Sequence, residues 1–264
     1  MNLSGKDSFW FWGGGLGVLL VVAGIAVYVY QRDRGPADAL PAAPASQPAS
    51  APAVAEPTPS LATAAPAQRA TPLPKLDESD AEVVGGLTEL VGREALQQLL
   101  VPQRIIRIVV VSIDYLPREK VAVNQRPIKS TPGKFIVTGP EDAREIAPEN
   151  YTRYAPLVAV VKRVDAQTLA SFYRGLQPLF QQAYEELGNP SGSFNARLLQ
   201  VIDHLLQTPD VAQPVQLVQP SVSFKYADPK LESLSSGQKL LIRMGPTNAG
   251  AIKAKLREVR AALS

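Results

Sequence analysis

The chain has 264 residues, with 27 lysines and arginines against 24 aspartates and glutamates, so its formal net charge is +3. It has no cysteine and a single histidine. These counts exclude a disulfide scaffold, a cysteine-ligated metal site, a thiol nucleophile and a metal centre built from several histidines. The small charge gives no reason to expect nucleic acid as a partner.

The first predicted element is a membrane-spanning helix over residues 9–30, which follows a short N-terminal tail of residues 1–8. The stretch carries no charged residue and is as long as the about 20 residues that a helix needs to cross a bilayer. A cleaved signal peptide is the alternative, but its apolar region is usually only about 7–15 residues long and ends at a small-residue cleavage site. Aromatic residues lie at both ends of the stretch, as in the aromatic belts of membrane helices: Trp10, Trp12, Tyr28 and Tyr30.

The flanks of this helix leave its orientation open. Lys6 precedes it, and Arg32 and Arg34 follow it, so the count of basic residues does not decide which end is cytoplasmic. Gly13 and Gly17 have the spacing that lets two membrane helices pack closely. The sequence therefore predicts lipid bilayer as one partner and a homodimer through this glycine pair.

Residues 31–75 are predicted to form a disordered linker. Ten of the 24 prolines fall within residues 36–74, and alanine, serine and threonine make up most of the remainder. Such a composition cannot bury enough apolar surface to fold. In an extended conformation of about 3.1 Å per residue, the linker would reach on the order of 100 Å. That reach suits a bacterial inner-membrane protein whose C-terminal domain lies in the periplasm.

The remaining residues, 76–264, are predicted to form one mainly α domain with a small β element. Helices are expected from Asp165 to Leu187, from Ser193 to Gln207 and from Ser235 to Met244, because a capping residue precedes an amphipathic pattern in each case. A last helix is expected from Pro246 onward. Residues 215–218 and 222–226 alternate as two strands of a hairpin.

Two segments of this domain are less defined. The apolar run 105–113 is rich in β-branched residues, so a helix that starts at Pro102 and a buried strand are both compatible with it. Residues 148–163 are expected to form a helix that is interrupted at Pro156.

Three side chains are candidates for acid–base chemistry. His204 is the single histidine, but its neighbour Asp203 cannot orient it, because consecutive helical residues do not face each other. Glu185 and Asp203 lie on neighbouring helices and are the best candidates for the carboxylate pair of a glycan-cleaving enzyme. A buried histidine and solvated helix-end carboxylates are the competing interpretation.

Basic residues of the last two helices are candidates for binding an anionic ligand. Lys253, Arg257 and Arg260 recur along one side of the last helix, and Lys239 and Arg243 of the preceding helix could join them. A solvated helix face is the alternative interpretation. The sequence has no phosphate-binding glycine loop, dinucleotide fingerprint or zinc motif, so no cofactor and no metal are expected.

Several segments resemble a proteobacterial family: LPKLDESD (73–80), NYTRY (150–154), FQQAYEELG (180–188), VIDHLL (201–206), LVQP (217–220), YADP (226–229) and SGQKLLIRMGP (236–246). The family is a bacterial domain of unknown function, number three thousand and fourteen, and the resemblance covers most of residues 73–262. It implies one N-terminal membrane helix and a Pro/Ala spacer, with no established activity. It also implies that Glu185, Asp203, His204, Gln238 and Arg243 lie in motif segments.

The sequence thus favours a non-catalytic protein that presents a periplasmic domain to another component of the cell envelope, either a protein or a cell-wall polymer. The long linker supports this hypothesis, because it gives the domain reach while keeping it near the membrane. An enzyme that cleaves cell-wall glycan with Glu185 and Asp203 is the alternative.

Overall fold

The computed structural model describes residues 72–119, 135–220 and 224–264. The predicted membrane helix, with its aromatic ends and its glycine pair, and almost all of the predicted linker lie outside these residues. In the part of the chain that is described, no helix combines the length and the apolar character needed to cross a bilayer.

The domain is mainly helical and has one small antiparallel sheet, as predicted. Its elements in chain order are η2 (Leu76–Glu78), α3 (Asp80–Val91), α4 (Arg93–Leu99), α5 (Ile105–Tyr115), β1 (Val137–Thr138), β2 (Arg144–Ile146), α6 (Glu149–Thr152), α7 (Ala155–Arg163), α8 (Ala166–Glu186), α9 (Phe194–Leu206), β3 (Gln216–Val218), β4 (Lys225–Tyr226), α10 (Pro229–Glu232), α11 (Ser236–Arg243) and α12 (Pro246–Leu263).

The capping residues begin the predicted helices. Asp165 accepts from the backbone N–H of Thr168 at the start of α8, and Ser193 caps α9 in the same way. Ser235 and Gln238 form a complete capping box on α11. The predicted hairpin is also present, since β3 pairs antiparallel with β4.

Two helix boundaries differ from the prediction. The run 105–115 is a helix, α5, but it begins at Ile105 rather than at Pro102. The break between α6 and α7 falls at residues 153–154 rather than at Pro156, which lies in the first turn of α7. A proline fits there because the first N–H groups of a helix have no intrahelical partner.

We call the part built from α3, α4, α5, α7, α8, α9 and α12 the helical body. Its centre is α5, whose apolar residues are buried on nearly all sides, which explains why periodicity alone left its structure open. Phe180 of α8 and Phe194 of α9 are fully buried and stack with their ring centroids 5.5 Å apart. Tyr173 packs against both rings. The body is therefore held by a large apolar and aromatic core.

We call the other part, formed by β1–β4, α6, α10 and α11, the sheet end. The strand order is β1-β2-β3-β4, and all neighbours are antiparallel. Ile146, Leu217 and Tyr226 face inward and form a small second core with Val215 and Ile242. Glu145 and Gln216 are paired in the register and belong to the opposite face of the sheet.

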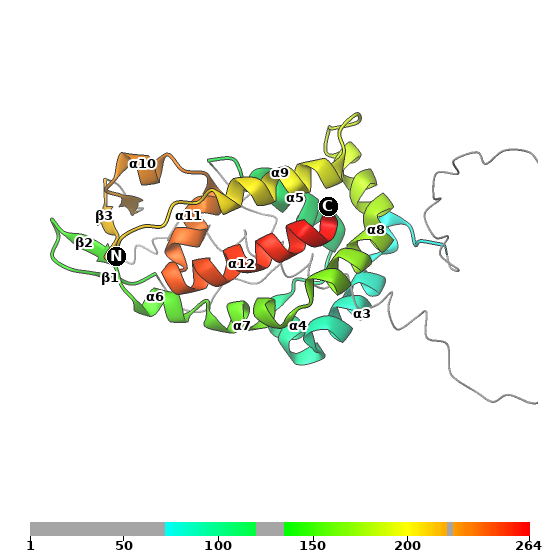
Figure 1. The fold of residues 1–264 in the computed structure, drawn as a ribbon, viewed down its shortest axis with the longest axis horizontal. Coiled ribbons are helices and arrows are strands. Elements are labelled where there is room, and N and C mark those ends of the chain that lie inside the picture. The colour runs from blue at the N-terminus through cyan, green and yellow to red at the C-terminus, as the bar shows by residue number, and fades with distance from the viewer. Residues whose placement is uncertain (1–71, 120–134, 221–223) are drawn as a thin grey trace, which may run out of the picture.

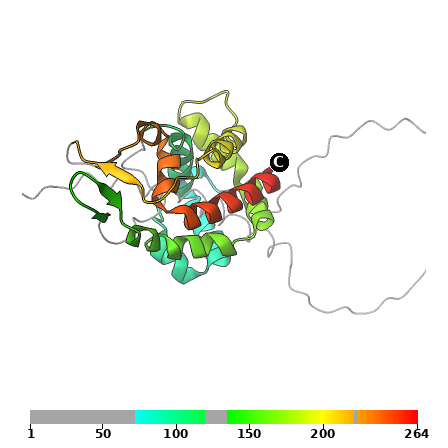
Figure 2. The ribbon, with the colours of Figure 1, turned by 60° about the vertical axis from the view of Figure 1, so that its left-hand side comes forward.

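Figure 1 shows the two parts along the long axis of the molecule. The strands and α6 occupy one end, and the described chain begins beside α8 at the other end. The turned view in Figure 2 again has the sheet at one extremity of the domain. The start of the described chain is therefore remote from the sheet.

Candidate functional site

A pocket of about 330 Å³ lies where the sheet end meets the N-terminus of α12. One wall comes from β2 and the residues that follow it, Glu145, Ile146 and Pro148, together with Tyr151 of α6. The other walls are Gln213, Pro214 and residues 244–248. Three segments that are far apart in the sequence thus converge on one space.

Tyr151 fixes the shape of this pocket by packing over Gly245. Gly245 has a φ of +81°, and a Cβ atom built on it would lie 2.5 Å from the Tyr151 ring. The Tyr151 hydroxyl lies 2.5 Å from Oε1 of Gln213, and burial raises its pKa. Position 245 therefore needs a glycine both for its backbone conformation and for the ring above it.

Asn248 ties the first turn of α12 to α6. Its Nδ2 donates to the backbone oxygens of Tyr151 and Met244, each at 2.8 Å. Gly245 precedes the helix and has no side chain that could cap it, and Pro246 has no N–H. The N–H groups of Thr247 and Asn248, which have no partner within a helix, are thus at the wall of the pocket.

Glu145 supplies the charge of the pocket. Its Oε1 accepts from Nε2 of Gln216, on the neighbouring strand, at 2.7 Å. Among the described residues that line the pocket, no other side chain is ionised at neutral pH, and none is lysine or arginine. The arrangement can offer a carboxylate, amide and backbone hydrogen-bonding groups, and apolar contact with Tyr151 and Pro214.

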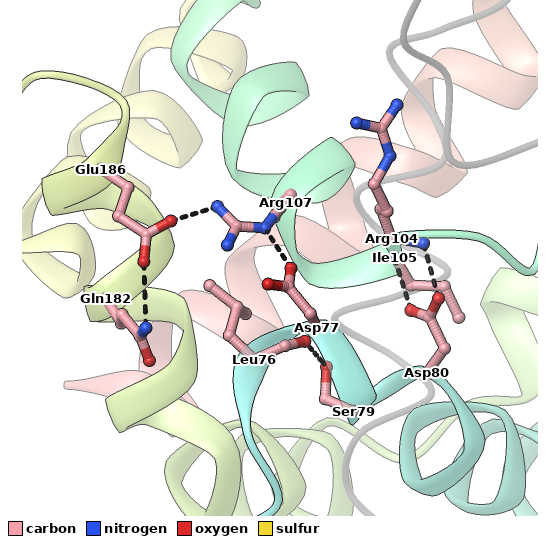
Figure 3. Close-up of polar contacts among 9 residues, drawn as sticks. All are labelled: Leu76, Asp77, Ser79, Asp80, Arg104, Ile105, Arg107, Gln182 and Glu186. Carbon is pink, nitrogen blue, oxygen red and sulfur yellow. Dashed lines mark hydrogen bonds and ion pairs between the residues drawn. The ribbon is translucent and has the colours of Figure 1, made fainter.

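A cluster of charged residues holds the start of the described chain to the helical body (Figure 3). Nε of Arg107, on α5, lies 2.9 Å from Oδ1 of Asp77, and the same guanidinium is paired with Glu186 of α8. The hydrogen bond from Arg107 is the main cause that lowers the pKa of Glu186, and a hydrogen bond from Gln182 lowers it further. These contacts bind the N-terminal segment to two helices.

Asp80 adds a second attachment in the same region. Its carboxylate accepts from the backbone N–H groups of Arg104 and Ile105, at 2.6 and 2.8 Å. These groups begin α5, so an aspartate distant in sequence caps that helix (Figure 3). The start of the described chain is therefore held to the helical body by Asp77 and Asp80, together with the buried side chain of Leu76.

The structure gives His204 a partner that the sequence did not identify. Nε2 of His204 lies 2.8 Å from Oγ of Ser235. That Oγ also accepts from the N–H of Gln238 as the cap of α11, and Ser235 is buried. Burial is the main cause that lowers the pKa of His204, and the positive charge of Arg197 lowers it further. This contact joins α9 to the start of α11. The Ser235 hydroxyl, which would have to act as the nucleophile, serves as a helix cap instead.

Glu185 and Asp203 have separate partners in the structure. Glu185 is exposed at the end of α8 and accepts from Gln181 of the same helix. Asp203 is paired through both oxygens with Arg260 of α12, which lowers its pKa. A general acid needs a raised pKa, so the environment of Asp203 is the opposite of the one that this role requires.

The candidate basic residues lie in different environments. Lys253 is buried, and its Nζ donates to the backbone oxygen of Thr208 at 2.6 Å and to Asp210 at 2.9 Å. Arg260 is occupied by Asp203, and Arg257 is exposed.

Lys239 and Arg243 are both buried in α11. Lys239 pairs with Glu232 at 3.1 Å, and Arg243 lies between the rings of Phe135 and Tyr226, 5.7 Å from each centroid. Together with Lys253 and Arg260, these side chains connect elements of the domain to one another.

The pocket was missed by the sequence analysis. Its lining comes from segments around residues 145, 151, 213 and 245, and no short motif joins them. The dipeptide Gly245-Pro246 was the one available signal, because a glycine before a helix-starting proline marks a sharp turn. In the described ranges, no group of three or more histidine, cysteine or acidic side chains could hold a metal ion.

The comparison with protein families gives one result. A family model described as "Protein of unknown function (DUF3014)" matches residues 105–260, which begin with α5 and end near the end of α12. No curated protein and no solved structure matches the chain. Because the match covers more than half of the sequence, the chain belongs to this family of proteins of unknown function.

Proposed function

We propose that this protein is a membrane-anchored binding protein, in which residues 9–30 span the inner membrane and residues 31–75 connect that helix to a periplasmic domain. The domain would bind an envelope component through the pocket beside Tyr151 and Gly245. The apolar, aromatic-flanked segment 9–30 and the proline-rich segment after it support the anchor and the linker.

The observation that carries the proposal is the position of the pocket. It lies at the sheet end, whereas the described chain begins beside α8, at the other end of the domain (Figure 1). Asp77 and Asp80 bind the start of the described chain to α5, so the described chain begins away from the pocket. A domain attached in this way would leave its pocket unobstructed by the attachment and accessible to other envelope components.

Site-specific photo-crosslinking in cells tests this proposal. A photoreactive residue at Thr247 or Gln213, both exposed at the pocket, is expected to capture the same envelope component. The control position is Gln98, exposed on α4 in the helical body. Capture at Gln98 as efficient as at Thr247, or no capture at either pocket position, would contradict binding through the pocket.

The membrane placement has a separate test. Alkaline phosphatase fused after residue 70 is active only when it is exported, so the fusion is expected to be active in intact cells. An inactive fusion that is present at the normal level would place the domain on the cytoplasmic side, and the periplasmic part of the proposal would be wrong.

A further inference from the structure

The pocket combines one acidic side chain with apolar walls and hydrogen-bonding groups, and we propose that it binds a lysine side chain presented by a segment of the partner protein. This inference rests on the proposed binding function, because it names the chemistry of what the pocket takes. It commits to a protein partner with an exposed, positively charged segment.

The first argument is charge. Glu145 is the one charged side chain among the described residues that line the pocket. Gln216 donates to one of its oxygens, and Oε2 receives no hydrogen bond in the described part of the structure. A partner ammonium group could therefore bind a carboxylate that the sheet already holds in place.

The two arginines that directly precede pocket-lining residues, Arg144 and Arg243, contact other groups. Arg144 precedes Glu145 on β2, so it belongs to the other face of the sheet, where it contacts Gln219 and the Phe224 ring. Arg243 precedes Met244 and lies between Phe135 and Tyr226. Neither guanidinium forms an ion pair with Glu145, so no cation among the described residues cancels the charge of this carboxylate.

The second argument is shape. A volume of about 330 Å³ corresponds to about ten water molecules at ~30 Å³ each, which is enough for the stem of one long side chain and part of its backbone. Tyr151, Pro148 and Pro214 supply apolar surface along such a stem. The Tyr151 ring also offers a face that attracts an ammonium group.

The N-terminus of α12 offers hydrogen-bond donors to the partner's backbone rather than a binding site for an anion. The N–H groups of Thr247 and Asn248 lack intrahelical acceptors and can donate to a carbonyl oxygen. The helix dipole contributes only about half a unit of positive charge at this point, whereas Glu145 carries a full negative charge. A carbonyl next to an ammonium group fits both features.

The test uses the methionine methyl signals of the full chain in neutral detergent micelles. The chain has only two methionines, Met1 and Met244, so carbon-13 labelling of methionine methyl groups yields one signal from the pocket and one reference. The probes are the N-acetyl N-methylamides of lysine, norleucine and glutamate, compared at constant ionic strength. Norleucine has the lysine stem without the ammonium group.

The lysine probe is expected to shift the Met244 signal with an affinity about three-fold or more above that of the norleucine probe, as an exposed ion pair allows. Glu145→Gln is expected to abolish this preference. Glu149→Gln, which removes an exposed acid of α6 outside the pocket lining, is expected to preserve it.

Three outcomes would overturn the inference. They are no Met244 shift with the lysine probe, equal affinity for the lysine and norleucine probes, and an equal or stronger response to the glutamate probe. The last result would mean that the α12 N-terminus selects anions. Since these titrations need no cell and no intact partner, they can fail while the crosslinking test succeeds, and the reverse also holds.

Discussion

The helical body and the sheet end are stabilised in different ways. In the body, long helices cover a continuous core, and rings such as Phe180 and Phe194 are completely buried. The sheet end has a small core and depends on individual polar contacts: Asn150 bonds to both the N–H and the oxygen of Ile136 and to the oxygen of Ala147. The comparison indicates that the body provides stability and that the sheet end positions a few side chains around a pocket.

The largest loss of stability is expected from a substitution in the core of the helical body. Phe180→Ala removes a fully buried ring that stacks on Phe194 at 5.5 Å, and it should lower the free energy of unfolding by about 3–5 kcal/mol. Urea titration of the full chain, followed by far-ultraviolet circular dichroism, measures this loss. Leu187→Ala, at an exposed position after the same helix, should change stability by about 0.5 kcal/mol or less. Similar losses for the two variants would contradict the assignment of the core.

The next largest loss of stability is expected from a substitution in the wall of the pocket. Gly245→Ala places a methyl group 2.5 Å from the Tyr151 ring at a φ of +81°, so it combines overpacking with a left-handed backbone. We expect a loss of about 2–4 kcal/mol and a changed Met244 methyl signal. Gly250→Ala is the matched control, because nothing lies within 4 Å of its added Cβ and alanine favours a helix by about 0.5–1 kcal/mol. A Gly245→Ala variant as stable as the Gly250→Ala variant would show that Tyr151 does not pack there.

The helical body and the sheet end also differ in how well the sequence predicts their elements. The starts of α8, α9 and α11 were predictable, because Asp165, Ser193 and Ser235 each bond to an N–H three residues ahead. Strand β2 was not predicted: it has three residues, and its stability comes from β1 and β3 on either side rather than from its own pattern.

The candidate site was less predictable than the helices for the same reason. Spacing along α12 predicted a basic side that includes Lys253 and Arg260, but their environment depends on Asp210 and Asp203, which belong to other segments. Spacing within a helix describes its faces and does not describe what covers them. The partnership of His204 with Ser235 is likewise a contact between α9 and the start of α11.

Two buried tyrosines sharpen the comparison, with effects of opposite sign. The hydroxyl of Tyr173, in the body, is buried and has no hydrogen-bond partner among the residues that the structure describes, so Tyr173→Phe should raise the free energy of unfolding by about 1 kcal/mol. The hydroxyl of Tyr226, at the sheet end, donates to the backbone oxygen of Lys239 at 3.0 Å, so Tyr226→Phe should lower it by about 1 kcal/mol. The same urea titration measures both, and each variant is the control for the other. A loss of stability in Tyr173→Phe would mean that its hydroxyl is paired.

The smallest expected effect concerns the ion pairs that hold the start of the described chain to the body. Arg107 lowers the pKa of Glu186, so this pair stabilises the fold above the ordinary carboxyl pKa of about 4.5, and the contribution disappears as the pH falls through the lowered pKa. Arg107→Gln should therefore be less stable than the natural chain at pH 7, and this deficit should become smaller as the pH falls toward 3. Arg93→Gln, at an exposed arginine of α4, is the control and should differ little from the natural chain at either pH. If the deficit of Arg107→Gln were the same at both values, the arginine would act through packing of its stem on α5 and α8, and the chain leaving the domain would not be held there by charge.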